Sequence, residues 1–83
     1  MSARPVKHSL TLRGHRTSVS LEDPFWHAFR RIAARDGRAI NDLAAEIDAA
    51  RGTDTGLASA IRLFVLADLE RRAGTETEED TVS

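Results

Sequence analysis

The sequence predicts a small, mainly α-helical domain with a short β-ribbon near its N-terminal end. Residues 7–13 and 16–21 alternate between apolar and polar side chains, as strands with one buried face do. Residues 24–36, 39–51 and 57–72 instead carry apolar side chains at helical spacing, with glycines between the segments. At 83 residues the chain forms at most one domain, of a size at which dimerisation commonly supplements a marginal core.

Residues 16–21 form the strand on which the rest of the prediction depends. Thr17, Val19 and Leu21 make up its inward row, and Arg16, Ser18 and Ser20 make up its outward row. The backbone N–H and C=O groups of such a strand need a partner strand. That partner is either the segment just upstream or the same segment of a second copy, and the sequence leaves both open.

The upstream segment, residues 7–13, has its apolar row at Leu10 and Leu12. Its apolar positions are even-numbered, whereas those of the next strand are odd-numbered, so the chain must change phase between them. Gly14 lies in the gap and predicts a bulge or tight turn at residues 13–15. The segment then folds back as a hairpin or extends the sheet as an outer strand. We expect residues 1–6 to form a flexible arm, and residues 7–73 to form the domain.

Three amphipathic helices follow. The first helix is predicted to have Asp23 as its N-cap and Pro24 at its first helical position, and Gly37 predicts its end. The second runs from about Ala39 to Arg51. The third, residues 57–72, carries leucines outside its main apolar face, which predicts burial in an oligomer interface or by a partner. We expect residues 74–83 to be a disordered acidic tail.

Composition restricts the class of protein. The chain has no Cys, no apolar run long enough for a signal peptide or a membrane span, and no nucleophile or phosphate-loop motif. We therefore expect a cytoplasmic protein that is not an enzyme and has no cofactor. The net charge of −1 conceals an asymmetry: residues 1–38 carry 8 − 3 = +5 and residues 39–83 carry 4 − 10 = −6. The basic half favours an anionic partner such as nucleic acid.

The order of arm, strand, helix, glycine and helix resembles the ribbon-helix-helix family of bacterial DNA-binding proteins. The resemblance covers residues 15 to about 51 and rests on the stretches Arg16–Leu21 and Gly37–Asp42. It implies an intertwined homodimer whose paired strands enter the major groove of duplex DNA. Three departures are visible: two of the three outward residues are short serines, Ala39 replaces the usual Ser or Thr, and the third helix has no counterpart in the minimal fold.

The resemblance assigns roles to particular residues. Base reading falls to Arg16, Ser18 and Ser20, and these side-chain types can contact base edges independently of the family. Phosphate binding falls to the start of the second helix, at Ala39, Ile40 and Asn41. From the residues themselves, this helix start beside Arg38 and Asn41 could hold a phosphate, or Asn41 could be a simple cap and Arg38 a solvated side chain. Arg13 and His15 are expected as further phosphate contacts. The predicted dimer core is Val19, Leu21, Phe25, Phe29, Ile32, Ile40, Leu43 and Ile47.

We therefore expect a dimeric, sequence-specific DNA-binding protein that acts as a transcriptional repressor. Two alternatives remain: an antitoxin whose third helix and acidic tail cover a basic toxin, and a dimeric protein-interaction module that does not bind DNA. Assembly beyond a dimer through the third helix also remains open. His8, His15 and His27 lack the spacing of metal ligands, so no metal site is expected.

Overall fold

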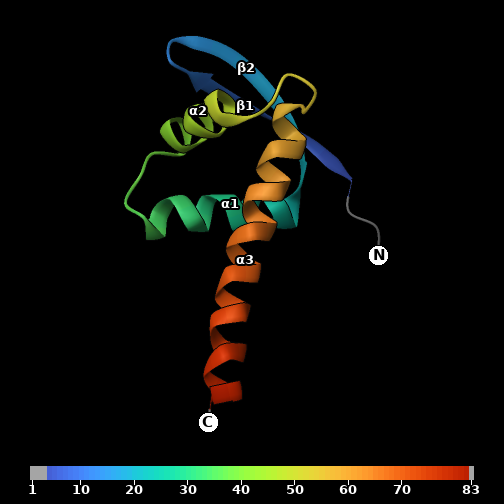
Figure 1. Ribbon diagram of the computed structural model, residues 1–83. Helices are drawn as coiled ribbons and strands as arrows, with labels where there is room; N and C mark the ends of the chain where they lie inside the picture. Colours follow the sequence, from blue (N-terminus) through green and yellow to red (C-terminus); the bar gives the residue numbers. More distant parts are fainter. Residues whose placement is uncertain (1–3, 83) are drawn as a thin grey trace.

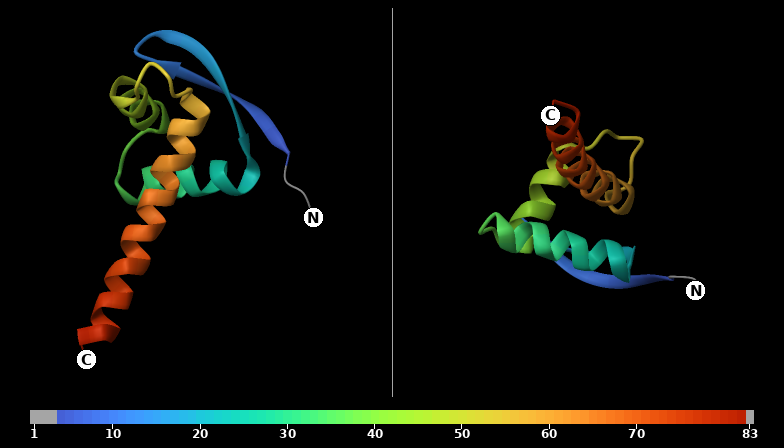
Figure 2. Two further views of the ribbon diagram at one scale, coloured as in Figure 1. Left: turned by 45° about the vertical axis from the view of Figure 1, so that its right-hand side comes forward. Right: turned by 90° about the horizontal axis from the view of Figure 1, so that it is seen from below.

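The computed structural model describes residues 4–82, with side chains through residue 74. A hairpin and three helices follow one another along this part of the chain (Figure 1): β1 (Pro5–Leu12), β2 (His15–Glu22), α1 (Asp23–Arg35), α2 (Ile40–Ala50) and α3 (Leu57–Val82). Helix α1 lies between the hairpin on one side and α3 on the other (Figure 2), and α2 packs against β1 and α3. The predicted class, a two-stranded ribbon followed by helices, is confirmed.

The partner of β2 is β1 of the same chain. The two strands pair antiparallel from Leu12 and His15 at the turn to Pro5 and Glu22 at the open end. Arg13 and Gly14 alone make the turn, with φ angles of 52° and 85°. Two central residues with positive φ are the mark of a type I′ turn, whose twist matches that of the strands. The hairpin therefore exists within one chain, and β1 begins at Pro5, inside the segment expected to be an arm.

Strand pairing explains the change of phase between the two apolar rows. Leu10 faces Thr17 across the ladder and His8 faces Val19, so even positions of β1 share a face with odd positions of β2. On that face Leu10 and Leu12 are buried, as are Val19 and Leu21. The predicted apolar rows of both strands and the predicted outward row of β2 are confirmed.

Helix α1 begins one residue earlier than the sequence predicted, with Glu22 rather than Asp23 at the N-cap position and no side-chain cap. The carboxylate of Glu22 is engaged by Arg62 of α3 instead. At the other end Gly37 adopts a φ of 65°. Arg38 N–H donates to the Ala33 carbonyl at 2.9 Å and Gly37 N–H to the Ala34 carbonyl at 3.1 Å. This is a Schellman motif, which uses the glycine as predicted.

Helices α2 and α3 differ in how well the sequence predicted their ends. Helix α2 has Ala39 and Arg51 as its flanking caps, close to the expected bounds, and Ala39 offers no side-chain cap. Helix α3 starts at Leu57 as expected but continues to Val82, past the predicted end at Arg72 and through most of the segment predicted as a tail. Extending an existing helix costs little, and residues 73–82 contain no proline; Gly74, the single glycine among them, lies within the helix.

A single chain encloses the core. Its buried side chains come from the hairpin and from all three helices. Those of α3 are Ile61 and Val65. Phe29 of α1 is fully buried and makes a T-shaped contact with Phe64, with ring centroids 6.2 Å apart. The residues expected between two chains are buried here (Val19, Leu21, Phe29, Ile32 and Leu43) or packed partly buried against the core (Phe25, Ile40 and Ile47). Their burial therefore does not require a second chain.

Candidate nucleic-acid interface

The outer face of the hairpin is a strip of polar side chains. Arg16, Ser18 and Ser20 of β2 are exposed on it. Their cross-strand partners are also polar and exposed: Thr11 faces Arg16, Ser9 faces Ser18, and Lys7 faces Ser20. Because the opposite face is held on the helices by buried leucines and Val19, these six side chains lie on the face of the hairpin turned away from the core.

The three β1 residues were absent from the predicted set of base readers. Their alternation with Leu10 and Leu12 already placed Lys7, Ser9 and Thr11 on one face. What the sequence left open was whether that face adjoins the outward row of β2. Pairing within the hairpin decides this and doubles the polar strip.

Two side chains bind the outer edges of the hairpin. In a hairpin with a two-residue turn, the residues next to the turn bond to each other, so Thr11 and Ser20 direct their backbone groups outward. The Thr11 N–H donates to Asn41 Oδ1 at 3.1 Å, and the Ser20 carbonyl accepts from Arg62 Nη2 at 3.3 Å. Asn41, predicted at a phosphate site, thus fastens α2 to β1.

The other residues predicted at the start of α2 are also constrained. The Arg38 guanidinium pairs with the Glu46 carboxylate. This hydrogen bond lowers the pKa of Glu46 and raises the pKa of Arg38, so both groups stay charged and their charges offset each other. Ile40 packs partly buried against the core, and Ala39 is exposed. The side chains here offer little free positive charge.

Positive charge gathers instead at the tip of the hairpin. A cleft of about 500 Å³ lies between β2 and the helices, lined by Leu12, Arg13, His15, Arg16, Thr17, Ser18, Ala45, Asp48, Ala49, Arg51 and Leu57. Three arginines and one aspartate give its lining a charge of 3 − 1 = +2. Arg51 is held by Asp48 Oδ1 at 2.7 Å and by the Thr55 carbonyl at 2.8 Å. The structure therefore brings Arg13, His15 and Arg16 together, joins Arg51 to them, and leaves Arg38 outside this group.

Comparison with known proteins identifies the family to which this hairpin and its helices belong. A family model, described as "Ribbon-helix-helix domain", matches residues 5–69. The chain belongs to the ribbon-helix-helix domain family. Comparisons with curated proteins and with solved structures gave no significant match.

The ribbon-helix-helix match is longer than the resemblance seen in the sequence, which covered residues 15 to about 51. It includes β1 and the first half of α3, so both belong to this family's pattern in the chain. Ribbon-helix-helix domains are in general regulatory DNA-binding modules and not enzymes, and they typically bind DNA as dimers.

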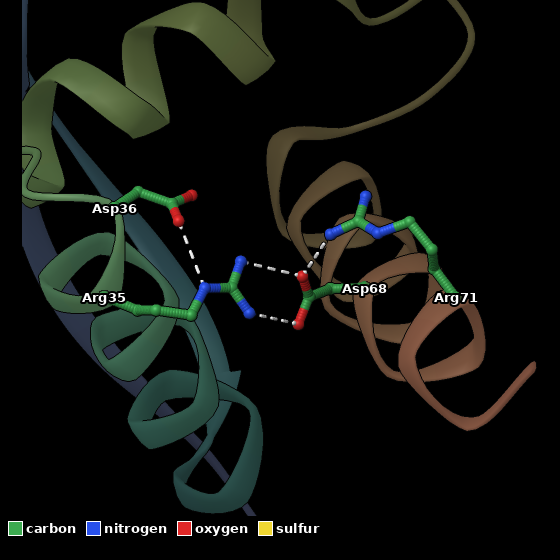
Figure 3. Close-up of polar contacts among 4 residues, drawn as sticks. All are labelled: Arg35, Asp36, Asp68 and Arg71. Carbon is green, nitrogen blue, oxygen red and sulfur yellow. Dashed lines mark hydrogen bonds and ion pairs between the residues drawn. The ribbon is translucent and has the colours of Figure 1, made fainter. Parts of the chain in front are cut away.

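Within this ribbon-helix-helix domain, α3 is held by two groups of ion pairs that the sequence analysis did not predict. In the first, Arg62 binds both carboxylate oxygens of Glu22, at 2.9 and 3.2 Å, which lowers the pKa of that carboxyl. The second, drawn in Figure 3, is centred on Asp68. The Asp68 side chain is only 3% exposed. Arg35 binds its carboxylate through two hydrogen bonds of 3.0 and 3.3 Å, and Arg71 adds one of 2.7 Å.

The Asp68 cluster is a structural contact between α1 and α3. The two hydrogen bonds from Arg35 are the main reason that the pKa of Asp68 lies below its usual value, and they raise the pKa of Arg35. A buried carboxylate without such partners would instead be driven toward its neutral form. The cluster and the Glu22–Arg62 pair therefore fix α3 relative to α1 and the hairpin.

The three histidines lie in different surroundings. His8 of β1 stacks on Trp26 of α1, with ring centroids 3.9 Å apart and planes 7° apart. His15 lines the cleft at the hairpin tip, and His27 is exposed on α1. Among the residues that the structure describes, no group of three or more His, Cys, Asp or Glu side chains could hold a metal ion. None of the helices in the described part is long and apolar enough to span a membrane.

Proposed function

We propose that this protein is a transcriptional repressor that binds duplex DNA in a sequence-specific manner by inserting the outer face of its hairpin into the major groove. The observation that carries the proposal is the strip of six polar side chains on a two-stranded ribbon whose other face is buried. A two-stranded ribbon has a shape that the major groove admits. Family membership supports DNA binding in general.

Base reading is assigned to both strands of the ribbon. Arg16 can make a bidentate contact to guanine, and Ser18 and Ser20 can donate to or accept from either kind of base pair. Lys7 also suits guanine, and Ser9 and Thr11 extend the set on β1. The cross-strand neighbours Ser9 and Ser18 lie mid-ribbon, where short side chains let the backbone approach the bases closely.

Phosphate binding is assigned first to the basic cleft at the hairpin tip. Arg13 and His15 line it beside Arg16, where DNA backbone flanking the groove would pass, whereas Arg51 in the same lining is already paired with Asp48. The start of α2, at Arg38, Ala39, Ile40 and Asn41, keeps its predicted role through backbone N–H groups, because free N–H groups at a helix start attract phosphate. The side chains there contribute less, since Arg38 and Asn41 are already engaged.

Repression follows from occupancy, because a protein bound at a promoter excludes other proteins from the same DNA. As a homodimer it would present two hairpins, so its operator would contain repeated half-sites arranged with the symmetry of the dimer. In cells this function requires a cytoplasmic location.

The test is selection of bound duplexes from a random library at fixed, near-physiological salt. The wild type is compared with a triple variant, Arg16→Ala, Ser18→Ala and Ser20→Ala. Arg72→Ala is the matched control, because it also removes one positive charge but lies on α3. A motif enriched by the wild type and the control and lost by the triple variant supports the proposal. No enrichment by a folded wild type, or the same motif from the triple variant, contradicts it.

A further inference from the structure

Helix α3 leaves a row of leucines uncovered. Its inner side is buried at Ile61, Val65 and Asp68, whereas Leu63, Leu66 and Leu69 are 60%, 48% and 50% exposed. These three leucines follow one another at three-residue spacing, so they form a row along the exposed side of α3. Exposed leucines grouped on one helix face are typical of an interaction surface rather than of a solvated one.

The sequence around these leucines is nearly symmetric about Leu66. Leu63 and Leu69 lie three residues to either side, where helical side chains share a face. Arg62 and Glu70 lie four residues to either side and have opposite charges. The small residues Ser59 and Ala73 lie seven residues to either side and let another helix approach closely. We call these seven residues the Leu66 patch.

We propose that the Leu66 patch binds the same patch of a second copy of this chain, with the two α3 helices antiparallel. A two-fold interface uses one patch twice, so each residue must suit the residue that symmetry places opposite it. In an antiparallel pair centred on Leu66, Leu63 lies level with Leu69 of the partner subunit. Arg62 likewise lies level with Glu70 of the partner subunit, so the outer leucines lie level with each other and the opposite charges do so as well.

The charges select the antiparallel arrangement. In a parallel pair Arg62 would lie level with Arg62 of the partner subunit, and Glu70 with the partner subunit's Glu70, so both contacts would be repulsive. Arg62 is also prepared for a second acidic partner. Its bonds to Glu22 and Ser20 use Nε and Nη2, and a guanidinium carries five donor hydrogens. Those bonds hold the side chain in place, which reduces the entropy lost on association.

The apolar surface continues beside the patch. A groove of about 400 Å³ between α2 and α3 is lined by Ile47, Ala50, Arg51, Gly52, Thr55, Ala60, Leu63 and Phe64. Leu63 thus belongs both to the groove and to the patch. This gives a second helix a wider apolar surface than three leucines alone.

The first test measures the oligomeric state of the full chain by sedimentation equilibrium without DNA. We expect a concentration-dependent dimer whose association constant falls by about tenfold or more in Leu66→Glu, because that change places two carboxylates at the two-fold axis. Ala34→Glu, at an exposed position of α1, is the matched control and should dimerise like the wild type. Circular dichroism confirms that each variant is folded.

The second test determines the direction of the helices. The chain contains no cysteine, so introduced cysteines are unique. Leu63→Cys and a mass-tagged Leu69→Cys are mixed and oxidised. The antiparallel pair predicts mainly mixed cross-links, whereas a parallel pair predicts cross-links within each variant. Glu70→Gln should weaken the antiparallel dimer and would strengthen a parallel one.

Several results would overturn the proposal. They are a wild type that stays monomeric at its highest soluble concentration, a dimer that survives Leu66→Glu, and cross-links that form only within each variant. A monomeric wild type that binds a different protein through the patch would also overturn it, and would favour the antitoxin alternative. Because DNA takes no part in these tests, failure of the proposed DNA-binding function leaves their outcome unchanged.

Discussion

At the scale of single residues, the hairpin separates base contacts from phosphate contacts. Arg16 lies on the outer face of β2, whereas Arg13 lies in the turn. We expect Arg16→Ala to cost about 1–3 kcal/mol on the preferred operator and to relax the preference at one base pair. We expect Arg13→Ala to weaken binding to all sequences about equally and to reduce the salt slope by about 1. Fluorescence anisotropy with operator and scrambled duplexes over a salt series measures both effects, and equal losses on both duplexes for both variants would disprove the division.

Asn41 has two candidate roles that substitutions can separate. Its Oδ1 accepts a hydrogen bond from the Thr11 N–H, and it also lies at the start of α2 beside a predicted phosphate contact. Asn41→Ala should lower the free energy of unfolding by about 0.5–1.5 kcal/mol, because the hydrogen bond is lost. Asn41→Asp keeps an acceptor oxygen but adds a negative charge, so it should keep most of the stability and weaken DNA binding.

Urea denaturation and DNA titration of the two Asn41 variants provide the comparison. If Asn41→Asp binds DNA as tightly as the wild type, then the start of α2 does not lie near a phosphate. The role of Asn41 would then be limited to fastening α2 to β1.

At the scale of elements, α3 has a buried side and an exposed side with different expected sensitivities. Ile61 is fully buried, so Ile61→Ala should destabilise the domain by about 2–5 kcal/mol. Leu66→Ala on the same helix removes an exposed side chain and should cost less than about 1 kcal/mol at concentrations where the protein is monomeric. Thermal or urea unfolding in dilute solution tests the contrast. Equal costs would mean that α3 does not pack on the core as the structure has it.

The Asp68 cluster predicts a particular dependence of stability on pH. The pKa of Asp68 is lowered in the folded protein, chiefly by the hydrogen bonds from Arg35, so the folded state binds fewer protons than the unfolded state does. The stabilisation is complete above the unfolded-state pKa of about 3.9 and is lost as the pH falls through the lower folded value.

Asp68→Asn tests this dependence, since it removes the titrating carboxyl but keeps its shape. The variant should be less stable than the wild type at neutral pH, and the difference should shrink as the pH falls below about 4. Urea unfolding at a series of pH values measures the difference. A constant difference across the series would show that the charge of Asp68 does not contribute.

At the scale of the whole molecule, the sequence predicted those features that depend on the local spacing of apolar residues and on single turn residues. Alternation assigned inward and outward rows in both strands, and Gly37 marked the end of α1. It did not decide the partner of β2, because Arg13–Gly14 lacks the Asn–Gly pair that most strongly signals a two-residue hairpin. Alternation also placed Lys7, Ser9 and Thr11 on one face of β1. Only the pairing of the two strands brings these additional base-reading candidates next to the outward row of β2.

Contacts between distant residues were not predictable in the same way. Glu22 and Arg62 are 40 positions apart, and Arg35 and Asp68 are 33 apart, so no local pattern connects them. Asp68 was especially hard to predict, because an aspartate in a helix is expected at the surface and its burial depends on an arginine from another helix. The basic cleft was likewise hidden, since Arg51 joins the hairpin tip only through folding.

The two-residue turn between β1 and β2 also has a consequence for how the protein folds. In a ribbon made from two chains, strand pairing would require an encounter between molecules and would slow down on dilution. Here the paired residues next to the turn, Leu12 and His15, are separated by only two residues, and hairpins of this kind form in about 1–10 μs. The surface proposed to read DNA is therefore assembled within one molecule, at a rate independent of protein concentration, and a newly made chain can carry it before meeting another copy.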